Sequence, residues 1–380
     1  MRLNTIRFAS LAVLVSLMSF VQTAPAATDA EASAIIQEYD RLHRLWLTEM
    51  RLAPDARALD MIVKKRPDPT EYATKLKKLL ARDLAHDWTL KYGAWLLEND
   101  QGIDEEGNPS LKPESQRALL NAVEEHHVNS PLVGRFCIAM VHLNDSGEVP
   151  APGSIPLKSR GMKLLEKIQK NNPDPKVQGQ AALAASIMLG SLGDDPRIME
   201  QRIKNIREAV IKSADVKVGN VTVADIARDE LFKINNLSKG RTAPDIVGVD
   251  SGNRPLKLSD FRGKVVMLVF WSSWDPDASR SLELLRKSAA SKASQAFLIL
   301  GVNRDSLTNL RSLEADRIVT WRNFSDPNQE IAKHYRIGSW PHCMVVDQEG
   351  VIQYRGVVGA FADAVASDLL QPKADKVPVK

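Results

Sequence analysis

The pattern of apolar and polar positions divides the chain into two parts. Between residues 28 and 238, apolar side chains recur every three or four positions, as in the stripe formed by Ile35, Tyr39 and Trp46. This spacing is typical of amphipathic helices. Further along, the pattern changes to short continuous apolar runs such as Val265 to Trp271. Such runs predict strands that are buried on both faces of a sheet. We therefore expect an all-helical part followed by an α/β part.

Helix starts in the first part are marked by a capping residue followed by a proline. A side-chain oxygen at the cap accepts a free backbone N–H, and proline suits the first helical turn. Small side chains within Gln180 to Leu189 would allow close helix packing. These features predict stacked helical hairpins in a repeat-like α-solenoid, although no strict repeat period fits. The four cap–proline pairs are Asp68-Pro69, Ser130-Pro131, Asp174-Pro175 and Asp195-Pro196.

The second part predicts an alternating order of strands and helices after a linker at Leu237 to Gly240. Two buried strands, each followed by a helix, precede a third helix, a hairpin and a closing helix. The predicted domains are therefore residues 28–238 (helical) and 241–372 (α/β), with a tail at 373–380. The predicted elements of the α/β part are strands at 265–271, 296–302, 343–346 and 351–355 and helices at 275–289, 305–316, 326–335 and 361–370.

The first 26 residues have the pattern of an export signal. Arg2 and Arg7 precede an apolar run from Phe8 to Val21, and Ala24-Pro25-Ala26 offers a cleavage site. No other stretch approaches the ~20 apolar residues that a membrane span requires. We expect a periplasmic or secreted protein with its signal removed at Ala26, and an uncleaved anchor is the alternative.

Composition and charge limit the classes of partner. The 380 residues carry a formal net charge of +4, and Lys and Arg are scattered along the chain. This distribution does not indicate nucleic-acid binding, and no motif indicates a cofactor. The two cysteines, Cys137 and Cys343, lie far apart in the sequence. They are either two buried free thiols or a bridge between the two parts, since geometry decides pairing.

The stretch from Val265 to Arg280, VVMLVFWSSWDPDASR, resembles a known active-site signature. It is similar to the strand-W-x-x-W-C-x-x-C-helix pattern of thioredoxin-like TlpA/ResA proteins in the redoxin (AhpC/TSA) group. Trp271 and Trp274 match the two tryptophans, whereas Asp275 and Ala278 stand at the two cysteine positions. The resemblance extends over residues 240–372 through the motifs A-P-D, L-S-D-F-R-G-K, S-D-P and W-P before V-V-D-Q-E-G.

The resemblance implies a thioredoxin-like fold in which Pro341 matches the family's cis proline beside the cysteine corner. Thiol–disulfide exchange requires an attacking thiolate and a resolving thiol, which Asp275 and Ala278 do not supply. The leading hypothesis is therefore a redox-inactive binding or scaffolding module for a periplasmic protein or peptide. The predicted groove consists of Trp271, Trp274, Asp275, Pro276, Trp340 and Pro341.

Two other functions stay open at the level of sequence. Cys343 could act as the thiol of an atypical oxidoreductase or antioxidant, alone or with Cys137; the competing interpretation is a buried strand residue. Asp275, Asp277 and His342 could together hold a metal ion, since carboxylates and imidazole are metal ligands. Neighbouring strand residues point to opposite faces, so at most one of His342 and Cys343 faces the corner.

Two single residues also have competing interpretations. Asp275 followed by Pro276 is a usual helix start, so its carboxylate could serve only as a cap. The indole of Trp340 could either fill the groove beside Pro341 or form an aromatic platform for a ligand. The sequence leaves both questions open.

Overall fold

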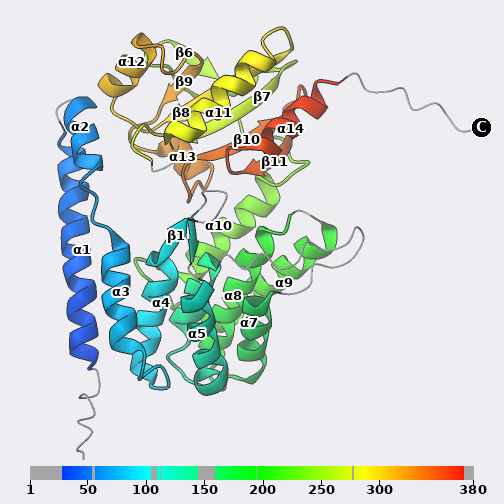
Figure 1. Cartoon of the computed structure of the whole chain (residues 1–380). Coiled ribbons are helices and arrows are strands. Elements are labelled where there is room, and N and C mark those ends of the chain that lie inside the picture. Colours follow the sequence, from blue (N-terminus) through cyan, green and yellow to red (C-terminus); the bar gives the residue numbers. More distant parts are fainter. Residues whose placement is uncertain are drawn as a thin grey trace, which may run out of the picture.

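The computed structural model describes residues 28–53, 56–103, 109–111, 113–143, 159–193, 195–275 and 278–371. A helical part and a sheet-containing part lie end to end, and α1 runs along one side of the helical part (Figure 1). The helices of the first part are α1 (Asp29–Arg51), α2 (Ala56–Val63), α3 (Pro69–Leu80), α4 (Leu90–Asn99), α5 (Pro113–Ala122), α6 (Gly134–Ala139), α7 (Arg160–Asn171), α8 (Pro175–Gly190), α9 (Pro196–Ser213) and α10 (Val223–Asn236).

The helical part also contains short elements that the periodicity did not predict. Two short hairpins connect helices within it. The hairpins are β1 (Gln101–Ile103) with β2 (Pro109–Leu111), and β3 (Lys217–Val218) with β4 (Val221–Thr222). Single turns of 3-10 or π helix occur at η1 (Asp87–Thr89), η2 (Val123–His127) and η3 (Met140–His142).

Three of the four predicted cap–proline pairs begin helices. The carboxylates of Asp68, Asp174 and Asp195 accept the backbone N–H two residues further on, at 2.8, 2.8 and 2.9 Å. The fourth prediction, Ser130-Pro131, is wrong because α6 begins only at Gly134. The Ser130 hydroxyl instead accepts the Leu132 N–H at 3.2 Å and donates to Asp87 at 2.8 Å, which stabilises a turn.

The central helix of the first part is α8, which packs against α6, α7 and α9. Its small residues Ala181, Ala182, Ala184 and Ala185 are all buried, as the sequence predicted. At Gly179 an added Cβ would lie 2.3 Å from the Ser213 hydroxyl oxygen on α9. The two helices therefore approach as closely as small residues permit.

The second part is built on one five-stranded sheet with strand order β11-β10-β7-β8-β9. Strands β7, β8 and β9 are parallel, and β10 is antiparallel to both β7 and β11. A separate hairpin of β5 and β6, the edge strand β9 and the short turn η4 were not predicted. The elements are β5 (Val247–Val249), β6 (Pro255–Lys257), η4 (Leu258–Phe261), β7 (Val265–Trp271), β8 (Phe297–Asn303), β9 (Arg322–Ser325), β10 (His342–Val346) and β11 (Ile352–Gly356).

Helices cover both faces of this sheet. On one face lie α11 (Ala278–Ser291), α12 (Leu307–Ala315) and α14 (Ala360–Leu369). On the other face lies α13 (Glu330–His334), together with the end of α10. Every residue of β7 is buried, as its continuous apolar run predicted. A parallel βαβ unit joined to an antiparallel hairpin and a closing helix is a thioredoxin-like fold.

The two parts have separate cores, but the connection between them is not a free linker. The helical core ends at Ile234, and the sheet cores begin at Leu237. In the predicted linker, the Gly240 N–H donates to the Ile352 carbonyl at 2.8 Å, and the Ala243 N–H donates to Gly350 at 2.9 Å. The linker is thus paired with the β11 edge of the sheet. The domain limits inferred from the sequence remain a prediction.

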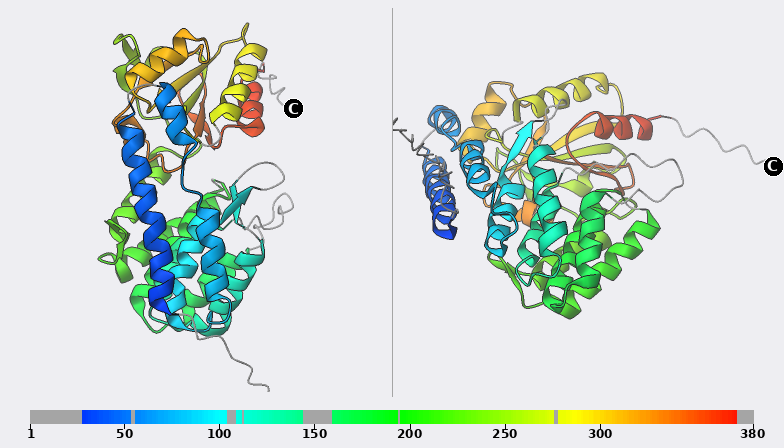
Figure 2. Two further views of the ribbon diagram at one scale, coloured as in Figure 1. Left: turned by 60° about the vertical axis from the view of Figure 1, so that its left-hand side comes forward. Right: turned by 60° about the horizontal axis from the view of Figure 1, so that its bottom comes forward.

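Side chains also connect the two parts. Phe232 of α10 packs against the sheet core, and the Arg336 guanidinium carbon lies 4.5 Å from the centre of its ring. Arg336 also donates to Asp229 of α10 at 2.6 Å. On the opposite side of the molecule, α2 reaches α12 (Figures 1 and 2). Among the described residues, the helical part therefore contacts the sheet part through both α10 and α2.

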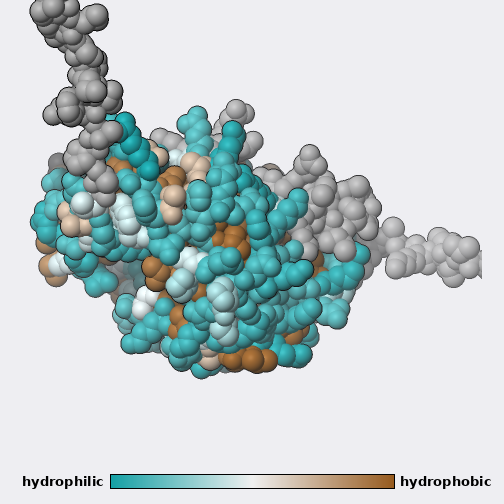
Figure 3. All heavy atoms as spheres, turned by 90° about the horizontal axis from the view of Figure 1, so that it is seen from below, coloured by the Kyte–Doolittle hydropathy of each residue, from teal (hydrophilic) through white to brown (hydrophobic). Residues whose placement is uncertain are grey.

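The predicted signal peptide lies outside the described residues. Within the described ranges, no helix has both the length and the apolar character needed to span a bilayer. The end of the helical part, seen from below, is mostly hydrophilic, with apolar residues in small separate groups (Figure 3).

Candidate functional site

Three loops meet at one edge of the sheet, where β7 and β8 end and β10 begins. Residues 272–275 follow β7, residues 304–306 follow β8, and residues 339–341 precede β10. The register places Phe270 opposite His342 and beside Val302, so the three loops leave the sheet side by side. The parallel arrangement thereby brings together predicted site residues that are far apart in the sequence.

The carboxylate of Asp275 is buried, with 6% of the residue exposed. One oxygen accepts the Ser272 backbone N–H at 2.9 Å, and the other accepts Arg304 Nη2 at 2.5 Å. A buried carboxylate requires such compensation, because an unpaired charge in the interior is strongly destabilising. The first described residue of α11 is Ala278. The sequence predicted a cap at Asp275; in the structure its carboxylate is bonded to the Ser272 N–H and to Arg304.

Arg304 lies between two tryptophans. Its guanidinium carbon is 4.0 Å from the ring centre of Trp274 and 4.0 Å from that of Trp340. Burial lowers the pKa of Arg304, and the neighbouring Asp275 carboxylate opposes that effect. The group stays protonated at neutral pH, because guanidinium does not lose its proton in proteins. We call Trp274, Asp275, Arg304 and Trp340 the corner cluster.

A second buried carboxylate, that of Asp305, connects two of the loops that carry the corner cluster. Asp305 accepts the Ser273 backbone N–H at 3.0 and 3.2 Å and the side-chain amide of Asn303 at 3.2 Å. Burial raises the pKa of Asp305. These bonds tie the loop after β7 to the loop after β8 and so hold Asp275 and Arg304 in register.

The third loop contributes Trp340 and Pro341, which are joined by a cis peptide bond. The resemblance implied a cis proline at this position. The Trp340 ring meets Phe270 edge to face, with 6.4 Å between ring centres, and packs against the sheet core. The Arg304 guanidinium carbon lies beside its ring. Both Trp274 and Trp340 remain partly exposed.

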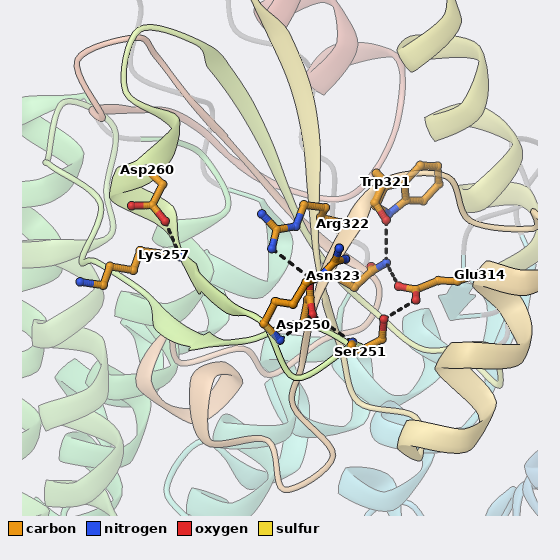
Figure 4. Close-up of polar contacts among 10 residues, drawn as sticks. Asp250, Ser251, Lys257, Asp260, Glu314, Trp321, Arg322 and Asn323 are labelled. Carbon is orange, nitrogen blue, oxygen red and sulfur yellow. Dashed lines mark hydrogen bonds and ion pairs between the residues drawn. The ribbon is translucent and has the colours of Figure 1, made fainter.

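Trp271, the first tryptophan of the motif, is not part of this surface. It is 2% exposed, and its indole N–H donates to Asn323 at 3.0 Å. Asn323 in turn donates to Glu314 at 3.2 Å and to the Trp321 carbonyl at 2.9 Å (Figure 4). The predicted groove is therefore wrong in including Trp271, because its indole N–H is hydrogen-bonded to Asn323 within the sheet.

The same network fixes the β5–β6 hairpin to the edge strand β9. The buried carboxylate of Asp250 accepts Arg254 Nε at 2.9 Å and Arg322 Nη2 at 2.9 Å (Figure 4). Ser251 donates to Glu314 of α12 in the same cluster. These contacts are satisfied within the fold, and we assign them a structural role.

Both cysteines are fully buried. Cys343 is fully buried in the sheet core, and burial raises the pKa of its thiol far above the usual range. Cys137 is fully buried in the helical core, where burial raises its thiol pKa to about 12. Both thiols are free, so the predicted bridge between the two parts does not form. A reactive cysteine needs an exposed thiolate, which disfavours the Cys343 oxidoreductase hypothesis.

Of the three residues that the sequence suggested as metal ligands, the structure describes Asp275 and His342. His342 is 8% exposed, and burial beside the positive charges of Arg355 and Lys233 lowers its pKa to about 3. Asp275 is already paired with Arg304. Asp277 and Pro276 lie outside the described residues. Among the residues that the structure describes, no three His, Cys, Asp or Glu side chains form a group able to hold a metal ion.

Arg304 is the residue that sequence reasoning missed. It follows the apolar run of β8 directly, within the polar triplet Asn303-Arg304-Asp305. Polar residues at the carboxyl ends of neighbouring parallel strands lie at the same edge of a sheet. This position was a usable signal, but the stacking of Arg304 between Trp274 and Trp340 depends on contacts that no sequence pattern marks.

Comparisons with known proteins match the C-terminal part of the chain. Residues 239–355 match the AhpC/TSA family. The thiol-disulfide oxidoreductase ResA of Geobacillus thermodenitrificans is 28% identical over 115 residues, which are 30% of this chain and 66% of that protein. ResA of Bacillus subtilis is 23% identical over 136 residues, which are 36% of this chain and 75% of that protein.

Among solved structures, the thioredoxin domain of a thiol-disulfide oxidoreductase from Bacteroides vulgatus is similar, with 26% identity and a TM-score of 0.33. The match covers 36% of this chain and 100% of that domain. The C-terminal part is similar in sequence to the ResA thiol-disulfide oxidoreductases. The chain spans just under two thirds of the Geobacillus relative, and the family match does not include the helical part.

Proposed function

We propose that this chain is an exported, redox-inactive binding or scaffolding protein for a periplasmic protein or peptide. The observation that carries the proposal is the ion pair of Asp275 with Arg304; the resemblance to TlpA/ResA proteins assigns position 275 to the first cysteine of their motif. The helical domain at residues 28–238 would support the thioredoxin-like domain at 241–372. Binding would use the exposed parts of Trp274, Trp340 and Pro341.

The chemistry of the corner supports this proposal. A carboxylate cannot attack a disulfide, and Ala278 offers no thiol to resolve a mixed disulfide. Arg304 and the Ser272 N–H bind the Asp275 oxygens, so the groups that would stabilise a thiolate are already bonded to a carboxyl group. Partly exposed indoles beside a fixed charge pair are well suited to recognition, because aromatic side chains contribute strongly to binding energy.

Insulin reduction by dithiothreitol tests the absence of redox activity. We expect wild-type protein to give the same rate of insulin precipitation as dithiothreitol alone. The Cys343→Ser variant, which removes the thiol nearest the corner, should give the same rate. A wild-type rate clearly above both controls would overturn the proposal.

Restoring the cysteines tests the assignment of the two positions. The double variant Asp275→Cys/Ala278→Cys should form a disulfide and accelerate insulin reduction, since Arg304 would favour a thiolate at position 275. Thiol titration before and after oxidation measures the disulfide. If the folded double variant keeps two free thiols under oxidising conditions, the two positions do not correspond to the family's cysteine pair.

A further inference from the structure

The corner cluster has the composition of a receptor for a guanidinium group. The Arg304 guanidinium carbon lies 4.0 Å from the ring centres of both Trp274 and Trp340, and its Nη2 donates to the Asp275 carboxylate at 2.5 Å. Aromatic faces attract cations, and a carboxylate matches the planar donor edge of arginine. The three receptor groups come from two loops, and the occupant comes from a third.

We propose that Trp274, Asp275 and Trp340 form a guanidinium cage, that Arg304 is its resident occupant, and that an arginine side chain of a peptide partner replaces Arg304. This inference rests on the proposed binding function and names the chemistry of the partner. It concerns an arginine in an extended segment that lies against the loop of Trp340 and Pro341.

The charge of Asp275 determines which ligand can enter the cage. Its carboxylate is buried, and its charged partner among the described residues is Arg304. A neutral or acidic ligand that displaced Arg304 would leave a buried charge without compensation, which is strongly unfavourable. One guanidinium exchanged for another keeps the ion pair and both stacking contacts. Exchange therefore favours arginine over other side chains.

Lysine would satisfy the cage less well. Its ammonium is a compact, strongly hydrated point charge, whereas the guanidinium is planar, more weakly hydrated and able to stack on aromatic faces. Two indoles that each contact the same cation suit a flat group. We therefore expect discrimination against lysine as well as against uncharged side chains.

Arg304 is placed so that it can leave the cage. It lies in the short loop between β8 and α12, in which Asp305 is buried and Ser306 is exposed. Its other side-chain contact is a long bond of 3.4 Å from Nε to the Ser272 hydroxyl. Rotation of the side chain into solvent needs no rearrangement of the sheet, because the backbone of β8 remains paired on both sides.

Removal of the resident arginine provides the test. The variant Arg304→Ala of the full chain is titrated with the blocked pentapeptide acetyl-Gly-Gly-Arg-Gly-Gly-amide and with its lysine and citrulline counterparts. Tryptophan fluorescence and calorimetry report binding. We expect the arginine peptide to bind at least about tenfold more tightly than the citrulline peptide, which has nearly the same shape without the charge. Arg304→Ala should also bind it at least about tenfold more tightly than wild type, where the tethered Arg304 competes.

Two control variants locate the binding. Arg286→Ala removes an exposed arginine from the middle of α11 and should bind like wild type. Arg304→Ala/Asp275→Asn removes the carboxylate and should lose the preference for arginine over citrulline. Equal binding of the arginine and citrulline peptides by folded Arg304→Ala would overturn the proposal. So would equal affinity of Arg304→Ala and wild type for the arginine peptide.

If Arg304→Ala does not fold, nuclear magnetic resonance of wild-type protein with 15N-labelled arginine replaces it. The Arg304 Nε–H signal should be shifted upfield by the two indoles and should move towards the solvent-exposed position as the arginine peptide is added. A signal that stays in place throughout the titration contradicts the exchange. Redox activity in the insulin assay would refute the proposed function without changing these binding results, and the two proposals can therefore fail separately.

Discussion

Asp275 and Arg304 illustrate how the environment of a residue decides its role. Taken alone, Asp275 followed by Pro276 is an ordinary helix start, and Arg304 is one basic residue among many. Together they form a buried ion pair between partly exposed indoles. Removing either partner leaves a buried charge, so the pair is strongly constrained once the fold has formed.

The single residue His342 should make the stability of the folded protein depend on pH. In the folded protein burial lowers its pKa from 6.5 to about 3, so the unfolded chain binds a proton between these values and the folded chain does not. Above pH 6.5, His342 therefore does not lower the free energy of unfolding. As the pH drops from 6.5 towards 3, the free energy of unfolding falls by up to about 1.4 kcal/mol for each pH unit because of this residue.

The variant His342→Gln has no group that titrates in this range. Its free energy of unfolding, measured by urea denaturation from pH 7 to pH 4, should fall less steeply than that of wild type. The difference between the two slopes isolates His342 from the carboxylates, which titrate in both proteins. Parallel slopes would show that His342 takes up a proton equally in the folded and unfolded states.

The elements show which sequence signals survive in the structure. The three Asp-Pro pairs correctly predicted where α3, α8 and α9 begin, because a cap acts locally through hydrogen bonds to the next turn. The Ser130-Pro131 start failed because Ser130 is bonded to Asp87, a partner that is distant in the sequence. Strand β9 was missed because its four residues, Arg322 to Ser325, show no long apolar run.

Gly179 provides a prediction about helix packing. An added methyl group would lie 2.3 Å from the Ser213 hydroxyl oxygen and 2.8 Å from its Cβ. Gly179→Ala should therefore destabilise the protein by about 1–3 kcal/mol, although alanine is the better helix former. Gly338→Ala is the matched control, since a Cβ there meets no atom within 4 Å. Thermal unfolding measures the stability of both variants. Equal stabilities would mean that α8 and α9 leave room for a methyl group at position 179.

At the scale of the whole molecule, α10 connects the helical part to the sheet part. Its inner residues Ala227 and Ile234 belong to the helical core, whereas Phe232 packs on the sheet core. The ion pair of Asp229 with Arg336 holds the same junction. We expect the two parts to unfold together as long as this contact is intact.

Phe232→Ala should weaken that coupling. The loss of part of a half-buried ring is expected to cost about 1–3 kcal/mol and to broaden the calorimetric transition or split it into two. Phe361→Ala serves as the control, because Phe361 is 69% exposed on α14 and should leave a single transition. A single, unshifted transition in Phe232→Ala would indicate that the two parts are coupled elsewhere, for instance where α2 meets α12.

The sequence by itself determined the two-part organisation, the helical character of the first part and the thioredoxin-like order of the second. These properties depend on periodicity, capping and turn residues, which act over a few neighbouring positions. It also determined that residues 275 and 278 carry no thiol. Each of these conclusions follows from residue type and local spacing alone.

Only the tertiary structure decided what the corner contains. It separated Trp271 from Trp274 and Trp340, because the first indole is bonded within the sheet and the other two flank Arg304. It also buried Cys343 and paired Asp275 with a residue 29 positions away. Strand order and register set these contacts, and they depend on which side chains meet across the sheet, a property that local patterns do not encode.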